Sequence, residues 1–200
     1  MRMRSEKGNA MVEFALASFL VLIPMFLGMV WSGISLGRGI QITQITRDAG
    51  HMYAKNIDFS APANKDIVVR LALGTSMTRD GGNGVVLLSQ IMKVYDADCA
   101  AASLDAATCT NLGKTVFAHR VTIGNTGLTN GQSRFGTPSP VNSDGSVPNY
   151  LTNAAAVATN FDRLLALQQG EVAYVAEGYL SSPDITFATG QAGVYAYSIF

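Results

Sequence analysis

The sequence predicts an α+β fold: a long N-terminal membrane helix followed by a small antiparallel β-sheet head with short helices. Three observations support this. An uncharged apolar run lies near the N-terminus, an amphipathic helical pattern continues directly from it, and β-rich stretches alternate with turn-rich ones in the remainder. The 200 residues allow one ordinary domain plus a dedicated segment.

The apolar run predicts a transmembrane helix over residues 9–37. No Asp, Glu, Lys or Arg occurs from Phe14 to Gly37, and this stretch would extend roughly 36 Å as a helix, against a hydrocarbon core of about 30 Å. A cleaved signal peptide is the alternative, but its apolar region is usually only about 7 to 15 residues before a small-residue cleavage site. Three basic residues precede the run, so the positive-inside rule predicts a cytoplasmic N-terminus and an exported head. The three basic residues are Arg2, Arg4 and Lys7.

Small residues within the run predict helix packing. Gly33 and Gly37 have the GxxxG spacing, and Gly28 with Ser32 extends a face on which helix backbones can approach closely. Pro24 lacks a backbone donor and clashes with the preceding turn, which predicts a local distortion of the helix.

The next segment, residues 38–56, is predicted to extend this helix and to pack under a head formed by residues 57–200. Its apolar residues recur at spacings of three and four, which is the pattern of one helical face. They are Ile42, Ile45, Ala49, Met52 and Tyr53.

The head is predicted to combine short helices with an antiparallel meander. A helix capped by Asn64 and ended by Gly74, a long surface loop over Gly124–Asn149, and a helix over Thr152–Gln169 are expected. Runs of β-branched and apolar residues predict the strands. The strands are expected over Val85–Tyr95, Val116–Ile123, Glu171–Leu180, Ile185–Ala188 and Val194–Phe200.

Composition and motifs disfavour nucleic-acid binding, a metal site, a cofactor and catalysis. The 14 basic and 14 acidic side chains cancel, so no overall attraction to nucleic acid is expected. Neither His51 nor His119 has ligand spacing to a cysteine or carboxylate, and the G-x-S-x-G and HExxH motifs are absent. In an oxidising compartment Cys99 and Cys109 are expected to form a disulfide; two free thiols are the alternative.

Glu13 lies between Val12 and Phe14, at the start of the apolar run. An ionisable group that enters a bilayer is costly without a partner and therefore indicates a functional position. The alternative is a glutamate whose carboxylate reaches back to the headgroups.

The segment from Lys7 to Leu16, KGNAMVEFAL, resembles the processing site of type IV pilin-like proteins. In detail it is similar to the TadE/TadF pseudopilins of tight-adherence (Flp-type) pilus systems, whose pattern is a glycine, four residues, and then Glu-Phe. The resemblance implies a cytoplasmic leader over residues 1–8, cleavage between Gly8 and Asn9 by a prepilin peptidase, and an assembly contact through Glu13 and Phe14.

The resemblance also implies partners and a location. These are other pilins or pseudopilins, an inner-membrane pilus assembly platform and membrane lipid, for a single-pass protein of the bacterial inner membrane. Independently of the family, cleavage would create an ammonium at Asn9, close to one helical turn from the Glu13 carboxylate, and the two charges would attract strongly once partly desolvated. The expected function is a minor pseudopilin in pilus assembly or initiation.

Two other classes of function remain open from the sequence. One is a signal-anchored periplasmic binding or adhesion module, with the loop Gly124–Asn149 as its contact surface. The other is a periplasmic hydrolase on a membrane tether.

Overall fold

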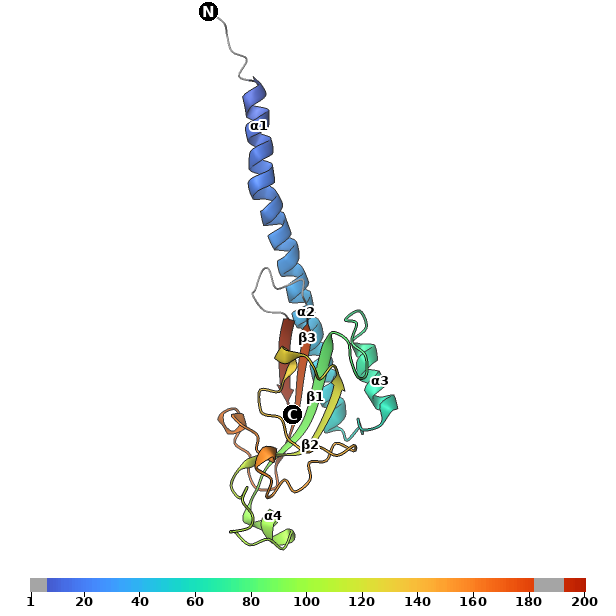
Figure 1. Cartoon of the computed structure of the whole chain (residues 1–200), viewed down its shortest axis with the longest axis vertical. Helices are drawn as coiled ribbons and strands as arrows, with labels where there is room; N and C mark the ends of the chain where they lie inside the picture. The colour runs from blue at the N-terminus through green and yellow to red at the C-terminus, as the bar shows by residue number, and fades with distance from the viewer. Residues whose placement is uncertain (1–6, 182–192) are drawn as a thin grey trace, which may run out of the picture.

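A long helix projects from a small α+β head in the computed structural model, which describes residues 7–181 and 193–200 (Figure 1). The helix consists of α1 (Lys7–Ala17), a π-helical turn (Ser18–Leu22) and α2 (Ile23–Ala54). The head contains a four-stranded antiparallel sheet and short helices. The predicted fold class is therefore confirmed.

The π-helical turn lies directly before Pro24, where the sequence predicted a distortion. A proline ring would clash with the carbonyl of the residue four positions earlier, and the wider turn relieves such a clash. The Ile23 amide donates to the carbonyl of Ser18, five residues back. The helix remains continuous through Gly37, Gly39 and Gly50.

The four strands are β1 (Gly84–Lys93), β2 (Thr115–Gly124), β3 (Val172–Ser181) and β4 (Gly193–Ile199). All neighbours are antiparallel, in the order β2-β1-β3-β4. The predicted simple meander is wrong, because β3 pairs with β1 and not with β2. The connection between β2 and β3 is long enough to cross the sheet, so sequence order does not fix strand order. The strand predicted over residues 185–188 lies outside the described residues.

The lower half of α2 packs on one face of the sheet, as the amphipathic pattern predicted. Ile42, Ile45 and Ala49 are almost fully buried, whereas Met52 is only partly buried. The helix approaches β3 at Gly178, where a methyl group would overlap the Thr46 hydroxyl and lie 2.8 Å from Ile42 Cδ1. The residue at this position therefore sets how closely helix and sheet can pack.

The opposite face of the sheet is covered by the long connection between β2 and β3. Phe135 and Phe161 from this connection pack edge to face at 5.7 Å and are buried with Phe117 and Val175 of the sheet. The predicted loop Gly124–Asn149 is irregular apart from a 3₁₀ turn at Thr129–Gly131. The connection therefore contributes buried hydrophobic residues to this side of the core, inserted among polar ones.

Two helix predictions in the head are wrong in their details. Helix α3 spans Pro62–Leu71, so Asn64 is not its cap. The side-chain amide of Asn64 instead donates to the backbone carbonyl of Asp58 at 2.6 Å. Proline is favoured in the first helical turn because its missing N–H is not needed there. The helix therefore begins two residues before Asn64.

No long helix forms over Thr152–Gln169; this segment has only the 3₁₀ turns Ala154–Ala156 and Phe161–Arg163. Asn160 has a φ of 64°, which breaks a right-handed helix. The Ala158 amide donates to the carbonyl of Thr115 at 2.8 Å. Tertiary hydrogen bonds therefore replace the local ones that a helix would need.

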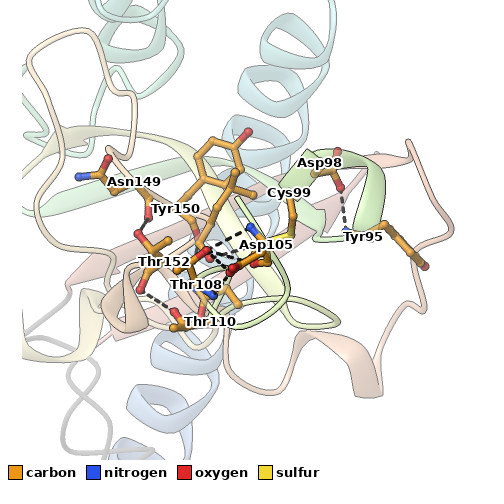
Figure 2. The surroundings of a disulfide bond; sticks show 12 residues. Tyr95, Asp98, Cys99, Asp105, Thr108, Thr110, Asn149, Tyr150 and Thr152 are labelled. Carbon is orange, nitrogen blue, oxygen red and sulfur yellow. Dashed lines mark hydrogen bonds between the residues drawn. A yellow bond between two sulfur atoms is a disulfide. The ribbon is translucent and has the colours of Figure 1, made fainter. Parts of the chain in front are cut away.

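Cys99 and Cys109 form the predicted disulfide, with an S–S distance of 2.00 Å (Figure 2). Cys99 lies on the short helix α4 (Asp96–Ala101), which the sequence did not predict. The neighbouring Asn111 is fully buried and its side-chain amide donates to the carbonyls of Tyr150 and Asn153. This loop lies at the end of the head farthest from the N-terminus (Figure 1).

Replacing both cysteines, as in Cys99→Ala/Cys109→Ala, is expected to lower the free energy of unfolding of the head by about 2 to 3 kcal/mol. The sequence separation is 10, so the bond restricts only a short loop of the unfolded chain. Chemical denaturation of the detergent-solubilised chain, followed by the near-ultraviolet circular dichroism of its tyrosines, measures the change. An unchanged midpoint would show that this bond does not stabilise the head.

Candidate functional site

The projecting half of the long helix exposes a continuous apolar surface. The helix over Ala10–Ala54 is long and apolar enough to cross a membrane, and none of its most apolar 18-residue window is buried. Phe14 is 72% exposed and Phe26 is 66% exposed. The core helix of a soluble protein would bury such side chains, so this surface needs an apolar environment outside the chain.

The residues of the predicted processing and assembly site lie on this projecting helix. Gly8 and Asn9 belong to the first turn of α1, and the Glu13 and Phe14 side chains are exposed. Within the described residues, Glu13 makes no hydrogen bond or ion pair with the head. The described part of the head therefore does not hold the Glu13 carboxylate.

The glycines predicted to mediate helix packing face open space. A methyl group at Gly28, Gly33 or Gly37 would meet no atom within 4 Å. By contrast, a methyl group at Gly50 would lie 2.9 Å from Ala176 Cβ and would also overlap the Phe200 ring. Close packing within this chain thus uses Gly50, whereas the three predicted glycines remain free for contact with another helix.

A buried charged network lies on the sheet face opposite α2, and the sequence did not predict it. Glu177 of β3 and Arg120 of β2 have side-chain exposures of 1% and 6%, with 3.8 Å between Oε2 and Nη2. The Glu177 carboxylate accepts hydrogen bonds from the Ser133 hydroxyl at 2.5 Å, from the Arg134 amide at 2.9 Å, and from the Tyr195 hydroxyl. No local pattern predicts this pairing, because the partners come from segments far apart in the sequence.

Burial and ion pairing have opposite effects on the pKa of the Arg120 guanidinium. Removal from water lowers the pKa of the Arg120 guanidinium, and the nearby Glu177 carboxylate raises it. The guanidinium also lies 4.5 Å from the centre of the Phe117 ring, a cation–π arrangement. Glu177 and Phe117 together compensate part of the cost of burying the charge.

A second polar contact joins the end of α2 to β2. The Tyr53 hydroxyl donates to His119 Nδ1 at 2.8 Å, and His119 Nε2 lies 2.7 Å from the carbonyl oxygen of Asp144. A carbonyl can only accept, so Nε2 carries the proton in this arrangement. His51 instead packs against Phe200, with ring centres 4.4 Å apart and ring planes tilted by 50°. Both histidines therefore have structural contacts.

The buried Tyr53 and the half-buried Tyr195 predict a loss of stability in alkali. Burial is the largest cause that raises the pKa of Tyr53 and of Tyr195, and the neighbouring Glu177 carboxylate raises that of Tyr195 further. A group whose pKa is raised on folding stabilises the head fully below its ordinary pKa of about 10, and this contribution is lost as the pH rises above that value. The denaturant concentration at the unfolding midpoint should therefore decrease as the pH rises above about 10.

Spectroscopic titration of tyrosinate, together with denaturation at each pH, checks this expectation. In Tyr53→Phe/Tyr195→Phe, the alkaline decline should be shallower than in the natural chain. Tyr197→Phe is the matched control, because Tyr197 is 46% exposed. If stability declined equally with pH in all three proteins, the alkaline loss could not be assigned to Tyr53 and Tyr195.

No group of three or more His, Cys, Asp or Glu that could hold a metal ion is present in the described residues, 7–181 and 193–200. No family model, curated protein or solved structure matches the chain. The fold and its exposed surface define the class as an α+β head carried on an N-terminal helix that is long and apolar enough to span a membrane.

Proposed function

We propose that the chain is a minor pseudopilin, similar to TadE, that takes part in the assembly or initiation of a tight-adherence (Flp-type) pilus. The observation that carries the proposal is the position of Glu13. It lies five residues after Gly8, where an exposed apolar helix begins. A simple anchor requires neither the glycine nor the carboxylate at this spacing.

The chemistry follows from cleavage after Gly8 by a prepilin peptidase. Hydrolysis of that peptide bond releases the leader and leaves an ammonium on Asn9. In a medium of low dielectric constant, a charge pair is worth far more than in water. The Glu13 carboxylate of an entering subunit would therefore bind the ammonium of its neighbour in the filament, and the exposed helices would pack side by side.

The free glycine face supports this assembly. Interfaces between membrane helices are enriched in small residues because lipid provides no hydrophobic drive for association, so close packing must supply the attraction. Gly28, Gly33 and Gly37 have open space around them. We assign them to contacts between the helices of neighbouring subunits or with other pilins.

The decisive experiment determines the mature N-terminus by intact mass and terminal peptide sequencing, with and without a co-expressed prepilin peptidase. A peptidase-dependent start at Asn9 is expected. Gly8→Val is the test variant, because a branched side chain hinders access of the protease to the backbone. The matched control is Gly28→Val, which lies in the same helix and should be processed normally.

Two results would overturn the proposal. An intact Met1 in the presence of an active peptidase would favour the signal-anchored binding or adhesion module. A mature N-terminus located after the apolar run would show that the head is secreted without an anchor.

A further inference from the structure

Helix α3 runs back along α2 toward the exposed apolar helix. Near the start of α3, the Asn64 side chain donates to the carbonyl of Asp58, just beyond the end of α2. After the end of α3, the Gln41 side-chain amide donates to the carbonyl of Leu73 at 3.1 Å. The chain that follows α3 therefore reaches the level of Gln41, at the end of the head nearest the N-terminus (Figure 1).

Gln41 lies close to the expected membrane surface. Gly37 is the last residue of the uncharged run, and the helix from Gly37 to Gln41 adds only about 6 Å. The headgroup layer on each side of the hydrocarbon core is roughly 5 to 7 Å thick. Cα–Cβ bonds in a helix tilt toward its N-terminus, so the Gln41 side chain leaves the helix on its membrane side. The Leu73 carbonyl that it binds is therefore at the depth of the headgroups.

The Leu73 side chain is apolar, and the head does not cover it. It is 75% exposed, the largest exposed fraction among the large hydrophobic residues of the described head. Leu71, at the end of α3, and Ile40, beside Gln41 on α2, are also exposed. Apolar side chains gain from leaving water, and those of interfacial segments lie about 5 to 10 Å into the boundary between headgroups and acyl chains.

The charged residues at this end of the head nearly balance. Arg79 binds Asp66 at 2.6 Å. Arg70 and Asp80 are both exposed and opposite in charge, and Arg38 adds one positive charge directly after the uncharged run. Little attraction to anionic lipid is expected from this set. Burial of apolar side chains, which zwitterionic phospholipid also allows, would supply the attraction.

We propose that this end of the head lies on the surface of a phospholipid bilayer, with Leu73 inserted at the boundary between headgroups and acyl chains. Leu71 and Ile40 lie beside it in the headgroup layer. The contact would orient the head relative to the membrane. It requires the long helix to span a membrane but does not require cleavage after Gly8, so a failed processing experiment would leave it intact.

Fluorescence quenching on the full chain in phosphatidylcholine nanodiscs tests the contact. The two cysteines of the chain are bound to each other, so Leu73→Cys introduces a single free thiol that an NBD fluorophore can label. Lipids with a nitroxide at the top of the acyl chain should remove about half or more of its fluorescence, given the shallow depth of interfacial side chains. Nanodiscs that hold one chain each exclude contact with a second copy.

Leu164→Cys provides the matched control at the opposite end of the head. Leu164 is 52% exposed. It lies near Leu167, whose carbonyl accepts a hydrogen bond from the Tyr95 hydroxyl at the start of α4 (Figure 1). Its label should keep its fluorescence. A label at Phe26→Cys, within the apolar run, should be quenched by nitroxides deep in the acyl chains and so reports insertion of the helix.

A second variant determines whether Leu73 itself holds the head on the lipid. The label is placed at Leu71→Cys, and Leu73→Gln is added. Quenching of the Leu71 label should fall about twofold, because glutamine does not supply the apolar contact. Leu164→Gln is the matched control and should leave this quenching unchanged. Near-ultraviolet circular dichroism should be the same in all variants, because both leucines are exposed.

Four outcomes would overturn the proposal. An unquenched Leu73 label beside a quenched Phe26 label would show that the head stands clear of the membrane. Emission of the Leu73 label at shorter wavelength without quenching would show that protein covers this site. Unchanged quenching in Leu73→Gln would show that the helix alone keeps the head near the lipid. An unquenched Phe26 label would remove the membrane span that the contact requires.

Discussion

Replacing Glu177 by leucine is expected to destabilise the head by about 3 to 5 kcal/mol, the range observed when one partner of a buried ion pair is removed. Arg120 would then remain buried without its carboxylate. The Ser133 hydroxyl, the Arg134 amide and the Tyr195 hydroxyl would lose their common acceptor. Because a small domain is stable by only about 5 to 15 kcal/mol, such a loss approaches global unfolding.

Denaturation followed by near-ultraviolet circular dichroism measures this change, and the double variant Arg120→Met/Glu177→Leu provides the control. Removing both charges leaves no isolated ion in the core, so the double variant should be more stable than Glu177→Leu alone. If the two variants were equally unstable, the loss would come from packing or from the other hydrogen bonds. If Glu177→Leu were as stable as the natural chain, the network would not hold the head together.

Replacing Glu13 by alanine is expected to abolish filament assembly while the chain still inserts into the membrane. Alanine is apolar, so the variant makes the helix more compatible with a bilayer. What is lost is the carboxylate that pairs with the ammonium of a neighbouring subunit in the proposed mechanism. We expect at least a tenfold fall in piliation, scored by electron microscopy of cells that carry the complete pilus system.

Glu13→Asp and Ser18→Ala separate the charge from the shape of the helix. Aspartate keeps the charge with a shorter reach and should restore part of the assembly. Ser18→Ala changes a polar residue of the same helix and should assemble normally. Membrane fractionation of each variant verifies insertion. Normal piliation with Glu13→Ala would refute the assembly role, and failed insertion would show that the residue acts earlier.

The long helix and the strands of the head could be predicted because their signals are local. The uncharged run that begins at Phe14 and the amphipathic spacing around Ile45 depend only on neighbouring residues. The pairing of Cys99 with Cys109 could be predicted because the chain has two cysteines, separated by 10 positions.

The predictions failed where distant segments supply the hydrogen-bond partners. Helical spacing around Phe161 suggested a long helix, yet its backbone neighbours bond to other parts of the head, and Asn160 adopts a left-handed conformation. Similarly, no local pattern could place β3 beside β1, because strand order depends on the path of a long connection. Helix and strand propensities are weak compared with such tertiary contacts.

The sequence by itself determined an apolar N-terminal helix with a carboxylate at its start, an α+β head, and one disulfide. Only the tertiary structure decided that Arg120 and Glu177 meet inside the head, that Gly178 lets α2 approach the sheet, and that Lys65 lines a cavity beside Arg120. The physical reason is that charge pairing, close approach and cavities depend on distances between segments that are remote along the chain. Periodicity and composition report only on what lies nearby in sequence.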